Sequence, residues 1–179
     1  MARYGINVPF RKNWQLLMYL FFAVFSFVLI YFAYNPRLLY LVYQPFFAFD
    51  SAFYDYHFQF KSGYISLLSQ FFMQYLYFPA AGSLIIVGFL ILIALCFRYI
   101  LQKSISSGYE GIEFSAPVLI LWQLKSYSSG MDTLLGLLSS CLFYMGSHIS
   151  KLTFIPRGVY ILLTVYFVYS VVGFPVALI

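Results

Sequence analysis

A run of 21 residues without a charged side chain, residues 14–34, constrains this sequence more than any other feature. At 1.5 Å per residue, a helix of that length crosses the roughly 30 Å hydrocarbon core of a bilayer. Arg11 and Lys12 precede the run, and Asn35 and Pro36 end it with a helix breaker. The run is longer than a signal-peptide core and lacks a small-residue cleavage site. It therefore predicts an uncleaved transmembrane helix.

The composition extends this conclusion to the whole chain. Hydrophobic residues make up 63% of the sequence and charged residues 8%, whereas a soluble domain carries about 25% charged residues. We therefore expect a single membrane-embedded domain, residues 1–179, with the lipid bilayer as its first partner. The ten basic residues are scattered at the ends of apolar runs and form no patch, so we expect no nucleic-acid binding.

The hydrophobic pattern predicts an all-α polytopic membrane protein. We expect about five transmembrane helices, at residues 14–34, 83–101, 114–128, 132–150 and 157–178. The third is the shortest, with 11 uncharged residues before Lys125, and needs Lys125 to snorkel or its neighbours to support it. Residues 102–113 form the most polar stretch and are predicted to be a loop outside the bilayer.

An amphipathic helix is predicted at residues 64–78, in the first loop. Its apolar residues recur at intervals of three and four, and its other face carries Ser66, Ser69, Gln70 and Gln74 without a charge. We expect this helix to lie at the membrane interface against the rest of the protein, and not on the surface as a basic membrane-binding helix.

The distribution of basic residues predicts the orientation. A cytoplasmic N-terminus places seven of the ten Lys and Arg residues inside and only Arg37, Lys61 and Lys125 outside. This asymmetry satisfies the positive-inside rule. We expect a bacterial inner membrane, with an organellar inner membrane as the alternative.

The first outside loop holds the candidate chemical residues, Asp50, Asp55 and His57. Two carboxylates and an imidazole among aromatic groups could act as a general base or bind a divalent cation. Their spacing matches no metal motif, so we predict neither a metal nor a cofactor. The favoured interpretation is that the two carboxylates keep the loop hydrated or cap short helices. Catalysis by these residues is the alternative.

Other residues have structural interpretations. We expect Asp132 to form an ion pair with Lys125 at the outer surface, and His148 to form interfacial hydrogen bonds. Gly136 and Ser140 are small residues four apart, which allow a second helix to approach closely. Cys96 and Cys141 both lie in predicted spans, and predict neither a disulfide nor a metal site.

Residues 63–84, GYISLLSQFFMQYLYFPAAGSL, resemble a segment of an uncharacterised family of Bacteroidetes polytopic membrane proteins. In that family a Gly precedes a helix with Phe and Gln, and aromatics, Pro and Gly precede the next span. The resemblance covers most of residues 14–150, but the family's Gly-Gly pair is here Ser62-Gly63. The resemblance implies no function. Because the members of that family are longer, it implies that this chain is a shortened or split member.

The layout is also similar, more distantly, to GT-C membrane glycosyltransferases, which place an acidic catalytic residue in the first outside loop. That resemblance implies that Asp50 or Asp55 would be a base or metal-associated carboxylate acting beside a lipid-linked sugar. Likeness of layout alone is a weak argument for function. This chain lacks the later spans and the soluble portion that such enzymes use.

We predict a non-enzymatic subunit or scaffold of a larger inner-membrane complex. The apolar run that ends at Ile179 has no polar tail, so we expect a protein partner or the remainder of a longer chain to cover it. The alternatives are the N-terminal part of a GT-C-like glycosyltransferase and a transporter module. The transporter ranks last because few polar residues lie along the spans; they are Gln123, Ser139, Ser140 and Thr164.

Overall fold

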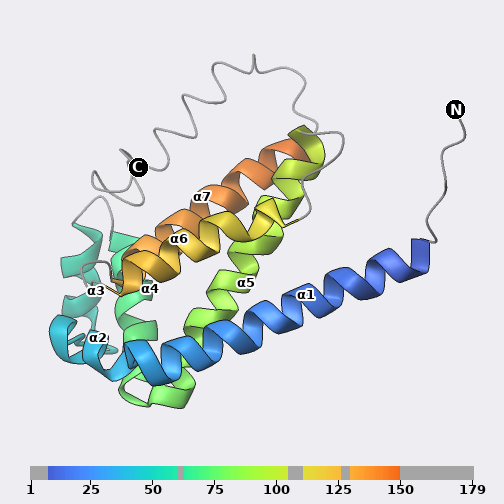
Figure 1. The fold of residues 1–179 in the computed structure, drawn as a ribbon. Coiled ribbons are helices and arrows are strands. Elements are labelled where there is room, and N and C mark those ends of the chain that lie inside the picture. The colour runs from blue at the N-terminus through green and yellow to red at the C-terminus, as the bar shows by residue number, and fades with distance from the viewer. Residues whose placement is uncertain (1–7, 60–62, 105–110, 126–129, 150–179) are drawn as a thin grey trace, which may run out of the picture.

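The computed structural model in Figure 1 describes residues 8–59, 63–104, 111–125 and 130–149. All regular structure in these ranges is helical, in seven α-helices, which confirms the predicted all-α fold class. Two stretches, Asn13–Tyr34 and Pro79–Lys103, are long and apolar enough to cross a membrane. Two others, Ile112–Leu124 and Met131–Gly146, are apolar but shorter. The predicted span at 157–178 lies outside the described residues, so the five-span topology stays a prediction.

The first long helix ends where the sequence predicted. Helix α1, Val8–Leu29, continues as a π-helical turn, Ile30–Tyr34, and stops at Asn35, whose φ is 43°. The Asn35 side chain accepts a hydrogen bond from the Arg37 backbone N–H at 3.3 Å. Pro36 then occupies the first turn of α2, Pro36–Tyr43. The fixed φ and missing N–H of proline suit a helix start, so these residues end one helix and begin the next.

The first loop folds into short helices beside the bundle. Helix α2 ends at Gln44, which is in the left-handed region with φ 41°, and Pro45 then prevents its continuation. An extended segment leads to α3, Ser51–Phe58. Helix α4, Gly63–Gln74, and the 3-10 turn Tyr75–Tyr77 confirm the predicted helix at residues 64–78.

Helix α4 buries a mixed face against the protein. Ile65 and Met73 are 6% and 3% exposed on that face, and Ser69 between them is 1% exposed. Tyr64, in contrast, is 72% exposed. The inward face of α4 therefore combines apolar packing with a buried hydroxyl, which needs a polar neighbour inside the protein.

Helix α5, Pro79–Ser104, is the centre of the bundle. It packs against α1, α2, the short α6, Ser115–Leu124, and most extensively α7, Met131–Ile149. Leu90 and Ile93 of α5 are fully buried. In Figure 1, α7 runs beside α5, and its first turn lies next to α3 and α4. Helix α7 thus connects the bundle core to the first loop.

Part of the predicted polar loop at 102–113 is buried instead. Residues Ile112–Phe114 form a 3-10 turn that packs on α5, and Glu113 is 5% exposed. The ring centroids of Phe114 and Phe22 lie 4.9 Å apart, so this turn is drawn onto α1 by aromatic packing. Arg98 donates to Gln15 and lies 5.9 Å from the Tyr19 ring centroid. These contacts join α1 to α5 at the end of the bundle distant from α2.

Candidate functional site

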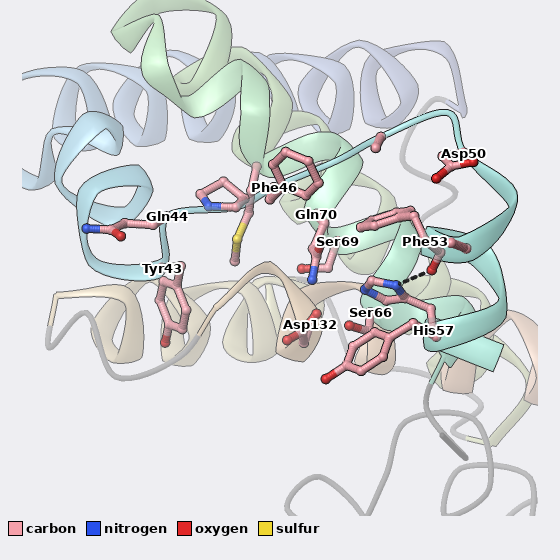
Figure 2. Close-up of a pocket in the computed structure, with 15 residues that line it drawn as sticks. Tyr43, Gln44, Phe46, Asp50, Phe53, His57, Ser66, Ser69, Gln70 and Asp132 are labelled. Atoms are coloured by element: carbon pink, nitrogen blue, oxygen red, sulfur yellow. Dashed lines mark hydrogen bonds between the residues drawn. The ribbon is translucent and has the colours of Figure 1, made fainter. Parts of the chain in front are cut away.

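A cavity of about 640 Å³ lies between the first loop, α4 and the first turn of α7 (Figure 2). Its size falls within the range of small-molecule sites. Four aromatic residues, Tyr43, Phe46, Phe53 and Tyr56, line it. Its neutral polar lining consists of Gln44, Ser66, Ser69 and Gln70, and its ionisable lining of Asp50, His57 and Asp132. The cavity therefore combines aromatic walls with polar groups from three separate segments.

The extended segment of the loop is held in place by aromatic packing. The Phe47 ring lies 5.4 Å from the Phe53 ring and 5.4 Å from the Phe71 ring, measured between centroids. Gln74 of α4 also donates a hydrogen bond to the Phe47 carbonyl at 3.4 Å. The segment thus joins α3 to α4 and forms a fixed wall of the cavity.

His57 is buried in this wall and is oriented by its own helix. Its Nδ1 lies 2.9 Å from the Phe53 carbonyl oxygen, one turn earlier, and its ring packs 4.3 Å from the Phe53 ring. A carbonyl oxygen only accepts hydrogen bonds, so Nδ1 carries the proton. The other nitrogen, Nε2, is therefore an acceptor in the neutral ring, and it faces the cavity (Figure 2).

Asp132 projects into the cavity from the first turn of α7, where the helix dipole stabilises a negative charge. Burial raises the pKa of its carboxyl, and the nearby hydroxyl of Ser69, which α4 turns inward, opposes part of that rise. The Asp132 side chain stays exposed to the open cavity. Burial raises the pKa of the Tyr43 hydroxyl, and the negative charge of Asp132 raises it further. Asp132 and Tyr43 therefore interact electrostatically across the cavity.

The predicted ion pair between Asp132 and Lys125 is wrong. Asp132 faces Ser69 instead, and the Lys125 ammonium lies 5.8 Å from the centroid of the Trp122 ring. The two side chains thus have different surroundings, which a separation of seven residues in the sequence does not reveal.

The structure places only two of the three candidate residues of the first loop at the cavity. Asp50 and His57 line the cavity, whereas Asp55 is exposed on α3 and does not line it. Asp50 stands at the N-cap position of α3 but makes no capping hydrogen bond with its side chain. Its Oδ1 lies 3.5 Å from the Ser51 hydroxyl, which donates to it. Asp50 therefore does not cap α3 through its side chain.

Sequence reasoning missed Asp132, Tyr43, Ser69 and Gln70 as lining residues. The polar stripe of α4 was visible in the sequence, but the surface opposite it was not. Asp132 reaches the cavity only through the packing of α7 against α4. Across the part of the chain that the structure describes, no group of three or more His, Cys, Asp or Glu residues is placed to hold a metal ion.

The predicted packing residues on α7 have local hydrogen bonds. Gly136 is buried, and its carbonyl accepts from the Ser140 hydroxyl at 2.7 Å. Their role in contact with another protein stays a prediction. Cys96 and Cys141 are free and buried. The side chain of His148 lies outside the described residues.

Residues 11–179 match the model of a family of unknown function, DUF6057. The chain belongs to this family. The predicted membership of an uncharacterised family is therefore confirmed. No curated protein and no solved structure matches this DUF6057 chain.

Proposed function

We propose that this DUF6057 chain is a membrane-embedded subunit that binds a small polar ligand or a lipid headgroup in the cavity described above. The observation that supports it is the convergence of Asp132, His57 and the inward stripe of α4 on one space. Polar groups placed in this way, among aromatic walls, are typical of ligand sites. Binding requires no chemistry from the subunit, so this proposal retains the predicted role within a larger complex.

The proposed position of the cavity is the outer surface of a bacterial inner membrane. The two long apolar stretches would cross the bilayer, and the loop between them, with the cavity, would lie outside if the N-terminus is cytoplasmic. Helix α1 supports a lipid-facing position, since Leu16 and Phe21 are 69% and 68% exposed. Water would disfavour such exposed apolar surface, whereas lipid solvates it.

The first experiment compares what the wild-type chain and a Ser66→Phe variant retain. Ser66 is half-buried in the cavity wall, and a phenyl ring there would occupy ligand space. After purification in a mild detergent, native mass spectrometry should show a bound mass on the wild type that the variant loses. Gly88→Ala is the control, because a Cβ at Gly88 meets no atom within 4 Å. Identical spectra for all three proteins would contradict the proposal.

A GT-C-like transferase is the second candidate. Its support is the presence of Asp50 and His57 in the same cavity, where either could take a proton from an acceptor hydroxyl. Turnover of a lipid-linked sugar in liposomes should then fall by 100-fold or more in Asp50→Asn, in line with loss of a general base. Asp55→Asn should retain activity. Equal turnover by both variants and the wild type would exclude a catalytic role for Asp50.

A further inference from the structure

The charge of the cavity is opposite to that of the chain. Among the residues that the structure describes, its lining contains Asp50 and Asp132 but no Lys or Arg, while the whole sequence has a net charge of +5. Two outer basic residues are held on aromatic rings instead: Arg37 lies 5.1 Å from the Tyr77 ring centroid and Lys125 5.8 Å from that of Trp122. Neither of them lines the cavity, so neither pairs with its carboxylates there.

The cavity also offers hydrogen-bond acceptors. The Asp132 carboxylate lies near the Ser69 hydroxyl and offers two oxygen acceptors when it is ionised. His57 is 5% exposed, with Nδ1 bonded to the Phe53 carbonyl, so its Nε2 presents a lone pair to the same space. In Figure 2, Asp132 and His57 lie on either side of Ser66. A complementary ligand must therefore donate hydrogen bonds to two groups.

Three classes of ligand could interact with these groups: a metal ion, a neutral sugar and an ammonium group. The surroundings of the cavity distinguish them. A metal ion is disfavoured because the described residues contain no group of three suitable ligands. A neutral sugar would supply hydroxyl donors but leave the carboxylate charge uncompensated in a partly enclosed site. An ammonium group supplies both donors and charge, and aromatic faces such as those of Phe46 and Phe53 attract cations.

We infer that the cavity binds a primary ammonium group, with Asp132 as its counter-charge and His57 Nε2 as a second acceptor. A primary ammonium has three N–H donors, which a quaternary ammonium lacks. This inference rests on the proposed function, since it names the ligand class of the same cavity. The group could belong to a free amine or to the headgroup of a lipid such as phosphatidylethanolamine.

The test compares amines with neutral molecules of the same shape. Calorimetry on the full chain in mild detergent would use ethanolamine against ethylene glycol, and glucosamine against glucose. We expect the amines to bind at least tenfold more tightly than their neutral counterparts. Asp132→Asn should remove that preference, and the matched control Asp55→Asn, on an exposed carboxylate outside the cavity, should keep it. If Asp132→Asn fails to fold, His57→Leu serves as the second variant and should weaken amine binding severalfold.

The source of the amine is distinguished in nanodiscs. Preferential retention of phosphatidylethanolamine over phosphatidylglycerol by the wild type, and its loss in Asp132→Asn, supports a lipid headgroup. Equal retention of the two lipids, together with binding of free ethanolamine or glucosamine, supports a soluble amine.

Two outcomes would overturn the inference. If glucose binds as tightly as glucosamine, or if a retained mass lacks an amine, the ligand class is wrong while the proposed binding function stands. If no probe binds and the wild type retains no mass that Ser66→Phe loses, both the inference and the proposed function fail.

Discussion

At the residue scale, Gly82 shows how closely the loop and the bundle approach each other. A Cβ at this position would lie 2.9 Å from the Leu76 Cα and 2.9 Å from the Pro36 Cβ. Backbone atoms and a proline ring cannot move aside cheaply, so only glycine fits. This contact joins the start of α5 to the start of α2, the helix that leads into the cavity wall.

We predict that Gly82→Ala destabilises the protein by about 1–3 kcal/mol, the usual cost of overpacking a buried site. The measurement is thermal unfolding in detergent, followed by tyrosine and tryptophan fluorescence. Gly88→Ala is the matched control within the same helix, because it meets no neighbouring atom and alanine favours a helix. An equal melting temperature for the two variants would contradict this account.

Features that depend on neighbouring residues were the most predictable from sequence. The end of the first span at residue 34 follows from Asn35 and Pro36, which act on their immediate neighbours. The surroundings of Asp132 were not predictable, because its neighbour Ser69 comes from a distant segment. Sequence proximity instead favoured Lys125, which the structure places on the Trp122 ring.

At the element scale, helix α4 connects the fold to the cavity. Its existence followed from the periodicity of residues 64–78, but periodicity does not say which face is buried. The surroundings decide that, and here Ser69 faces α7 while Tyr64 is exposed. The Ser69 hydroxyl and the Asp132 carboxyl are neighbours where α4 packs against the first turn of α7.

We predict that Ser69→Ala destabilises the protein by about 0.5–1.5 kcal/mol, because it removes a buried hydroxyl that lies near the exposed carboxylate of Asp132, where water can take its place. Ser66→Ala, on the same face but only half-buried, should cost less than about 0.5 kcal/mol. A double-mutant cycle with Asp132→Asn, read from unfolding curves, isolates the pair. If the effects of Ser69→Ala and Asp132→Asn simply add, the two side chains are not coupled.

At the scale of the whole molecule, two long helices, α1 and α5, stand beside a compact group of short helices, α2, α3 and α4 (Figure 1). The all-α class and the two helices long and apolar enough to cross a membrane were predictable, because composition and run length determine them. The burial of Glu113 was not predictable, because nothing in this short polar segment indicated that Phe114 packs against Phe22.

We predict that Phe49→Cys reacts with a membrane-impermeant maleimide in intact cells, because residue 49 is 85% exposed in the first loop. Gln102→Cys, exposed near the other end of α5, should react only after the cells are permeabilised. The native Cys96 and Cys141 are buried and should give little background. The reverse labelling pattern would place the N-terminus outside and overturn the proposed orientation.

The cavity has a consequence for how the protein is made. All of its lining residues except Asp132 lie between Tyr43 and Met73, so they leave the ribosome well before the residue that completes the site. Until the first turn of α7 is synthesised, Ser69 lacks its neighbouring carboxylate. The cavity therefore stays open on this side until a helix translated much later packs against α4. Completion of the binding site is tied to a late step of membrane insertion.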